Sequence, residues 1–162
     1  MNNRNANQGS KIARLSAARL AAVQAIYQMK ANGQNARNVI GEFKTHQLGK
    51  PVEGHNMVLP DGTLFTLVVE GVESRESDLK GMVDAALQAG QNDAKPRNSD
   101  ISIEPLLWSI LMCGAYELLA NHEADAPVII SDYIDVTHAF YEGGESRLVN
   151  GVLDRLSQSL RG

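Results

Sequence analysis

The stretch ISIEPLLWSILMCGAYELLA, residues 101–120, decides the fold class of this 162-residue chain. Wound as a helix, it carries apolar side chains on nearly every face: Leu106, Leu107, Trp108, Ile110, Leu111, Met112, Leu118 and Leu119. A helix of that kind is buried among other elements. Pro105 is compatible with its first turn, where the missing N–H has no helical partner. We therefore expect a central helix with other elements packed around it.

Apolar residues recur at helical spacing through most of the remaining chain, and no run of period two occurs. The pattern predicts a first helix over 11–31, after a Ser10 N-cap and ending near Gly33. It predicts further helices over 35–45, from an Asp61 or Thr63 cap through Leu87, from Pro127 to Phe140, and over 148–160. Gly71 and Gly81 leave the continuity of the third helix open. Residues 128–130 alone would fit a short strand, but the length of their segment favours a helix. The predicted class is all-α.

The length of the chain is typical of one domain with a sizeable core. Residues 1–10 read as a disordered basic tail, and residues 11–162 as a single domain. The polar run QNDAKPRNSD, residues 91–100, has only Ala94 as an apolar residue and is the best internal linker. It divides the domain into helical halves at 11–90 and 101–162.

Charge is distributed unevenly behind a formal net charge of −4. Residues 1–41 contain six basic residues and no acid, whereas 42–162 contain nine basic and all nineteen acidic residues. Because screening confines exposed charges to about 10 Å, the acidic body does not cancel a basic end. The pattern indicates a local anion site, with nucleic acid as one candidate. A solubilising tail followed by an ordinary helix explains it equally well.

The sequence offers no convincing catalytic or metal site. Cys113 is the single cysteine, and the four histidines are scattered at 46, 55, 122 and 138, so no zinc spacing is present. The glycines of FYEGGE, residues 140–145, lack the Lys and Ser/Thr of a phosphate loop. Cys113 lies in the most apolar helix, where a buried, unreactive thiol is expected. We expect a protein that is not an enzyme and needs no cofactor or metal.

No stretch of the chain reaches the eighteen or so uninterrupted apolar residues of a membrane span, and the polar start lacks the apolar centre of a secretory signal. The expected location is therefore the cytoplasm, without a membrane partner.

The basic residues of the first predicted helix do not form one stripe. At about 100° per residue, Lys11 and Arg14 are neighbours on one face, while Arg19 falls about 140° round from Arg14 inside the apolar arc. Lys11 and Arg14 are thus placed to meet a phosphate backbone. Arg19 can lay its stem on the core and reach either a ligand or a carboxylate at the rim, and the sequence leaves both open.

Several phrases resemble the NusB family in order and spacing: RLAAVQAIY at 19–27, GAYEL at 114–118, Pro127, ISDYIDV at 130–136 and VNGVLD at 149–154. The resemblance spans about residues 11–160. It implies two packed helical subdomains, in agreement with the division at 91–100. It further implies a factor without enzymatic activity that recognises single-stranded boxA RNA with the ribosomal protein NusE. Such factors join the transcription elongation complex and promote ribosomal RNA transcription by antitermination.

The resemblance also assigns site residues. RNA-binding positions of the family map onto Lys11, Arg14, Arg19, Arg147, Leu148 and Asn150, and Tyr27 lies where the surface for the protein partner would begin. For Asn150 a buried amide that fixes a helix junction is an equally good interpretation, and Gly151 beside it would admit close helix packing. For Tyr116 and Glu117 a structural role is the better interpretation.

The chain departs from the family pattern where RNA binding is concerned. RLSAAR, residues 14–19, has two arginines where the family often has a tight cluster, and Leu148 replaces a common phenylalanine. Trp108 and Met112 stand where arginine is common. These changes leave a second reading open: a helical protein–protein adaptor, or an accessory subunit of a ribosomal RNA methyltransferase, with weakened RNA binding. The length of the chain argues against a built-in methyltransferase domain.

Overall fold

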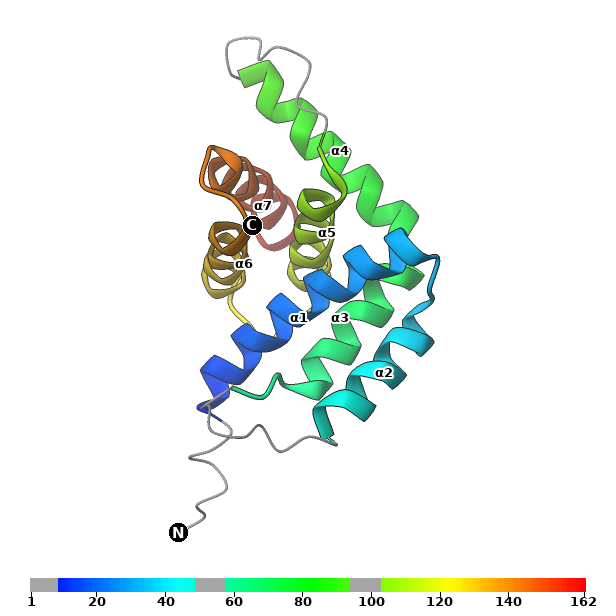
Figure 1. Cartoon of the computed structure of the whole chain (residues 1–162). Coiled ribbons are helices and arrows are strands. Elements are labelled where there is room, and N and C mark those ends of the chain that lie inside the picture. Colours follow the sequence, from blue (N-terminus) through cyan, green and yellow to red (C-terminus); the bar gives the residue numbers. More distant parts are fainter. Residues whose placement is uncertain (1–8, 49–57, 94–102) are drawn as a thin grey trace.

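The computed structural model describes residues 9–48, 58–93 and 103–162, which form seven α-helices and contain no β-strand. The helices are α1 (Lys11–Asn32), α2 (Ala36–Leu48), α3 (Gly62–Ser74), α4 (Glu76–Asp93), α5 (Pro105–Ala120), α6 (Ala126–Phe140) and α7 (Glu145–Arg161). The predicted all-α class is confirmed. In Figure 1, α1 runs diagonally with α2 and α3 on one side and α5, α6 and α7 on the other.

The ends of α1 are set by its own capping residues. The Ser10 hydroxyl accepts a hydrogen bond from the Ala13 N–H at 3.1 Å, which confirms the predicted N-cap. At the other end, Gly33 adopts a left-handed conformation with φ of 66°, and its N–H donates to the Met29 carbonyl. The helix ends at Asn32, directly before Gly33, which confirms the predicted end near that glycine.

The third predicted helix is two helices, and neither glycine causes the break. Asp61 caps α3 by accepting from the Leu64 N–H at 2.8 Å, and the chain leaves helical geometry at Arg75. Gly71 lies inside α3 and Gly81 inside α4. Helix α4 continues to Asp93, three residues into the predicted linker over 91–100. Residues 94–100, like residues 1–8 of the predicted tail, lie outside the described residues.

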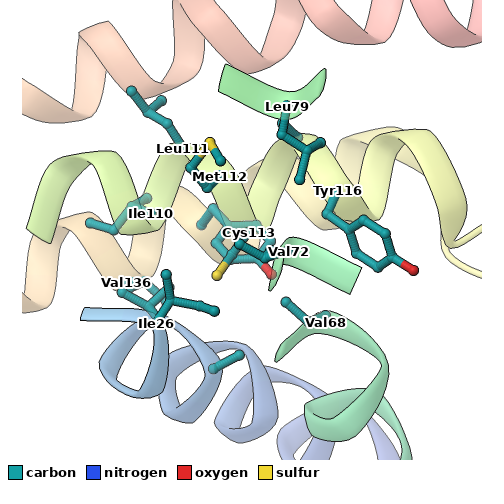
Figure 2. Close-up of a cluster of buried hydrophobic side chains, with 14 of the residues drawn as sticks. Ile26, Val68, Val72, Leu79, Ile110, Leu111, Met112, Cys113, Tyr116 and Val136 are labelled. Carbon is teal, nitrogen blue, oxygen red and sulfur yellow. The ribbon is translucent and has the colours of Figure 1, made fainter. Parts of the chain in front are cut away.

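Helix α5 is central, as its all-round apolar surface predicts. It packs against α1, α3, α4, α6 and α7, and its residues from Ser109 to Leu118 are all buried. Figure 2 shows the core around it, where Ile26 of α1, Val68 of α3 and Leu79 of α4 meet side chains of α5. One core cluster joins the two sequence halves.

Helix α6 includes the segment for which the sequence left a short strand open. Residues 128–130 belong to α6, so the helical interpretation of that segment is confirmed.

Two residues of α5 at which the chain departs from the family pattern lie in or against the core. Met112 is fully buried and Trp108 packs half-buried against the core, so both positions serve packing. Within the described residues, no helix is long and apolar enough to cross a membrane.

Candidate nucleic-acid interface

The start of α1 presents two basic side chains. Lys11 is exposed, and Arg14 is half-buried with its Nε donating to the Leu59 carbonyl at 3.3 Å. The Asp61 N–H donates in turn to the Arg14 carbonyl at 3.0 Å. The segment that precedes α3 is therefore bonded to the first turn of α1 by two hydrogen bonds. The first turn contains no acidic residue, so the positive end of the helix dipole is not neutralised there.

Arg19 lies elsewhere: its side chain is 2% exposed between α1, α5 and α6. Its Nε and Nη2 donate to the two oxygens of Glu117, at 2.8 and 3.0 Å, and its Nη1 donates to Asp132 Oδ2 at 2.6 Å. Burial by itself would lower the pKa of Arg19, but the bonds to the Glu117 and Asp132 carboxylates raise this pKa above its ordinary value. The structure therefore corrects the prediction that Arg19 lies at an RNA surface.

The two carboxylates that bind Arg19 also accept hydrogen bonds from other side chains. Glu117 is fully buried and accepts further bonds from the Tyr133 hydroxyl at 2.6 Å and the Asn121 amide at 2.8 Å. The Ser16 hydroxyl of α1 donates to Asp132 Oδ2 at 2.8 Å. Burial, and next the Glu117 charge, raise the pKa of Tyr133 well above its usual value, so the phenol stays protonated as a donor. The structural role expected for Glu117 is confirmed.

The start of α7 presents a second group of predicted residues. Arg147 and Asn150 are exposed, whereas Leu148 is half-buried and packs against the core. The interpretation of Asn150 as a buried junction residue is therefore wrong. A Cβ on Gly151 would meet only Arg155 Nη1 at 3.6 Å, an ordinary contact, so close helix packing does not explain that glycine.

A hydrogen bond that the sequence did not predict lies near the start of α7. The Tyr141 hydroxyl, just after α6, donates to Glu104, just before α5. Burial first, and then the bond to Glu104 and the charges of Glu104 and Glu145, raise the pKa of Tyr141. Tyr141 and Glu104 are 37 positions apart, so no local sequence pattern indicates their contact. Tyr27, the predicted partner residue, is 43% exposed on α1.

The predicted residues fall into two separate groups. Helix α6 packs against α1, where Asp132 binds Ser16 and Arg19. Lys11 and Tyr27 lie sixteen residues apart on α1, about 24 Å along the helix axis. Arg147 and Asn150 belong to α7, which does not pack against α1.

Two further sequence predictions concern the single cysteine and the possible metal ligands. Cys113, predicted to be inert, is fully buried, and burial raises its thiol pKa well above the usual value. No group of three or more His, Cys, Asp or Glu side chains is arranged to hold a metal ion in the part of the chain that the structure describes.

Comparison with known proteins gives a consistent result. Residues 16–158 match the model of the NusB family. The chain is 38% identical over 157 residues to the transcription antitermination protein NusB of Bradyrhizobium sp. (strain ORS 278), covering 97% of this chain and 89% of that protein. It is also 38% identical over 162 residues to the protein of the same name from Rhodopseudomonas palustris (strain BisB18), covering 99% and 92%.

Among solved structures, the chain resembles a NusB of T. maritima with a TM-score of 0.69. The likeness covers 91% of this chain and 92% of the other at 16% sequence identity. At that identity the match supports the helical fold.

Proposed function

Because the chain belongs to the NusB family, we propose that it is a transcription antitermination factor that binds boxA-type single-stranded RNA with a NusE-type small-subunit ribosomal protein. In this role it joins the transcription elongation complex and promotes ribosomal RNA transcription. The names of the relatives support the role in antitermination. The RNA and the ribosomal protein follow from the resemblance of the sequence. The protein acts by binding and assembly and catalyses no reaction.

The start of α1 is the feature that best supports the proposed binding of RNA. Lys11 and the free part of the Arg14 guanidinium lie at a helix start without acidic residues. The unpaired N–H groups and the dipole of a helix start favour phosphate oxygens. Among the described residues, Arg14 makes a side-chain hydrogen bond through Nε alone, to the Leu59 carbonyl. Its Nη groups are therefore available for a phosphate.

The second part of the proposed RNA surface is the start of α7, with Arg147, Leu148 and Asn150. An RNA that also touches Lys11 must reach from α7 to α1, which do not pack against each other, and this suits an unpaired strand. Tyr27 remains our proposed beginning of the ribosomal-protein surface, because it is exposed at the far end of α1 from Lys11.

The burial of Arg19 favours one alternative, a helical adaptor with weak RNA binding, since it removes an arginine from an already thinned cluster. An accessory subunit of a ribosomal RNA methyltransferase is the enzyme-associated form of that alternative. Partner binding without measurable RNA binding would distinguish either form from an RNA-binding factor.

A salt titration tests the proposal. Labelled single-stranded ribosomal leader RNA is titrated with the protein, alone and with the NusE-type protein, at several salt concentrations. Contacts from Lys11, Arg14 and Arg147 predict a slope of log affinity against log salt of about −2, at about −0.7 per phosphate. The double variant Lys11→Ala/Arg14→Ala should reduce the slope to about −0.7. Its control is Arg37→Ala/Lys44→Ala, which removes the same charge from exposed positions on α2.

Equal slopes for the two double variants would contradict an RNA contact at the start of α1. Failure of the wild-type protein to bind RNA at low salt, while it binds the ribosomal protein, would favour the adaptor.

A further inference from the structure

We infer that Arg19 is a positioning residue for RNA binding: together with Asp132 it fixes the orientation of α1, and so the separation of the two proposed RNA-binding groups. This inference rests on the proposed function. It replaces the direct contact predicted for Arg19 with an indirect role, which its burial between three helices requires.

The arrangement of the helices gives Arg19 this role. Helix α1, which carries Lys11 and Arg14, does not pack on α7, which carries Arg147 and Asn150. Among the seven described helices, only α5 and α6 pack against both of them (Figure 1). The Arg19 guanidinium binds one carboxylate on each of these two helices, Glu117 on α5 and Asp132 on α6. A large rotation of α1 relative to α5 or α6 would separate the guanidinium from at least one of these carboxylates.

The geometry of the bonds makes them directional. Nε and Nη2 of Arg19 meet the two oxygens of Glu117 in a bidentate pair, and Nη1 meets Asp132. Bidentate pairs add geometric specificity that apolar packing does not. Since a buried ion pair often adds little net stability over an apolar replacement, we assign the cluster to orientation rather than to stability.

Substitution of Asp132 can distinguish an effect on the orientation of α1 from an effect on the charge of the protein. Its side chain is 17% exposed, and removing it leaves the buried Arg19–Glu117 pair intact. It also accepts from Ser16, one turn before Arg19, so Asp132 holds α1 to α6 at two points. Without Asp132, α1 retains its bond to α5 and loses both polar bonds to α6.

The test compares Asp132→Ala with Asp135→Ala. Asp135 is on the same helix and exposed, and its carboxylate makes no hydrogen bond or ion pair with the described residues. Each variant removes one negative charge, so electrostatics alone predicts equal or tighter RNA binding for both. Positioning predicts instead that Asp132→Ala weakens RNA binding about three- to thirtyfold, the range for residues that act through intervening structure. Ser16→Ala, which changes no charge, should weaken binding in the same direction by a smaller factor.

Affinities are measured where circular dichroism shows each variant fully folded, so that lost stability alone does not change them. Weaker binding by Asp132→Ala and Ser16→Ala, with Asp135→Ala unchanged or tighter, would support positioning. Equal affinity of the two aspartate variants would overturn the inference while the RNA proposal stands. A wild-type protein that binds no RNA would overturn the proposed function itself, and the inference with it.

Discussion

At the scale of single residues, Gly71 and Tyr116 show how closely two halves of the sequence meet. A Cβ built on Gly71 would lie 1.9 Å from Tyr116 Cζ, so the phenol ring rests directly on the backbone of α3. Tyr116 is buried at 9% exposure in the middle of α5. The glycine therefore serves the packing of α3 against α5, at the expense of helix propensity.

Gly71→Ala should destabilise the protein by about 1–3 kcal/mol, because the Tyr116 ring must leave its place to admit the methyl group. The free energy of unfolding is measured from urea titrations. Gly81→Ala is the matched control: it lies in α4, and nothing would touch its Cβ within 4 Å. That change should stabilise the protein by about 0.5–1 kcal/mol. Changes of the same sign in the two variants would contradict this account of Gly71.

Arg19 shows which features of a buried side chain can be predicted from the sequence and which cannot. Helical spacing placed Arg19 on the apolar face of its helix, and its side chain does point into the core. Its partner Glu117 is 98 positions away in the sequence and Asp132 is 113 away. Local spacing determines the direction of a side chain, whereas only the tertiary fold determines which carboxylate it meets.

At the scale of whole elements, Arg161 connects the last turn of α7 to the end of α5. Its guanidinium donates to the carbonyls of Glu117, Leu118, Asn121 and Ala124 at 2.7–3.0 Å. The last carbonyls of a helix have no partner within it, and a cation there also complements the helix dipole.

Arg161→Ala should therefore lower the free energy of unfolding by about 2–4 kcal/mol, since four carbonyls lose a charged donor and water replaces it only in part. The urea midpoint measures this loss. Arg37→Ala, an exposed arginine on α2, should change the free energy by less than about 0.5 kcal/mol. A loss for Arg161→Ala no larger than for Arg37→Ala would show that the last turn of α7 does not support the end of α5.

Helix existence was predictable from the sequence, and helix ends were predictable where a local cap fixes them. Ser10 and Asp61 cap α1 and α3 through their own side chains, so both starts follow from residue type. The break at Arg75 has no comparable signal, because it lies between two apolar segments that share one helical pattern. Tyr141 and Glu104 come together only through the packing of α5 against α6.

At the scale of the whole molecule, the two sequence halves share one core. Helix α5 belongs to the second half, yet it packs against α1, α3 and α4 of the first. Cys113 lies in the middle of α5 with none of its surface exposed. Neither half can withdraw from the other without opening the surroundings of this thiol. The chain should therefore behave as the single domain predicted for 11–162.

Reactivity of Cys113 tests this behaviour. Burial, and next the Glu117 charge, raise its pKa well above the usual value in the folded state, and the thiolate is the reactive form. The thiol should thus resist a disulfide reagent at neutral pH until the core opens. If the chain unfolds as one unit, labelling of Cys113 and loss of the helical circular dichroism signal should share one urea midpoint. Labelling complete at urea concentrations where the helical signal is still native would show that the halves separate before they unfold. Because Cys113 is the single cysteine, its labelling reports on this one position at the centre of α5, with no second thiol to confuse the reading.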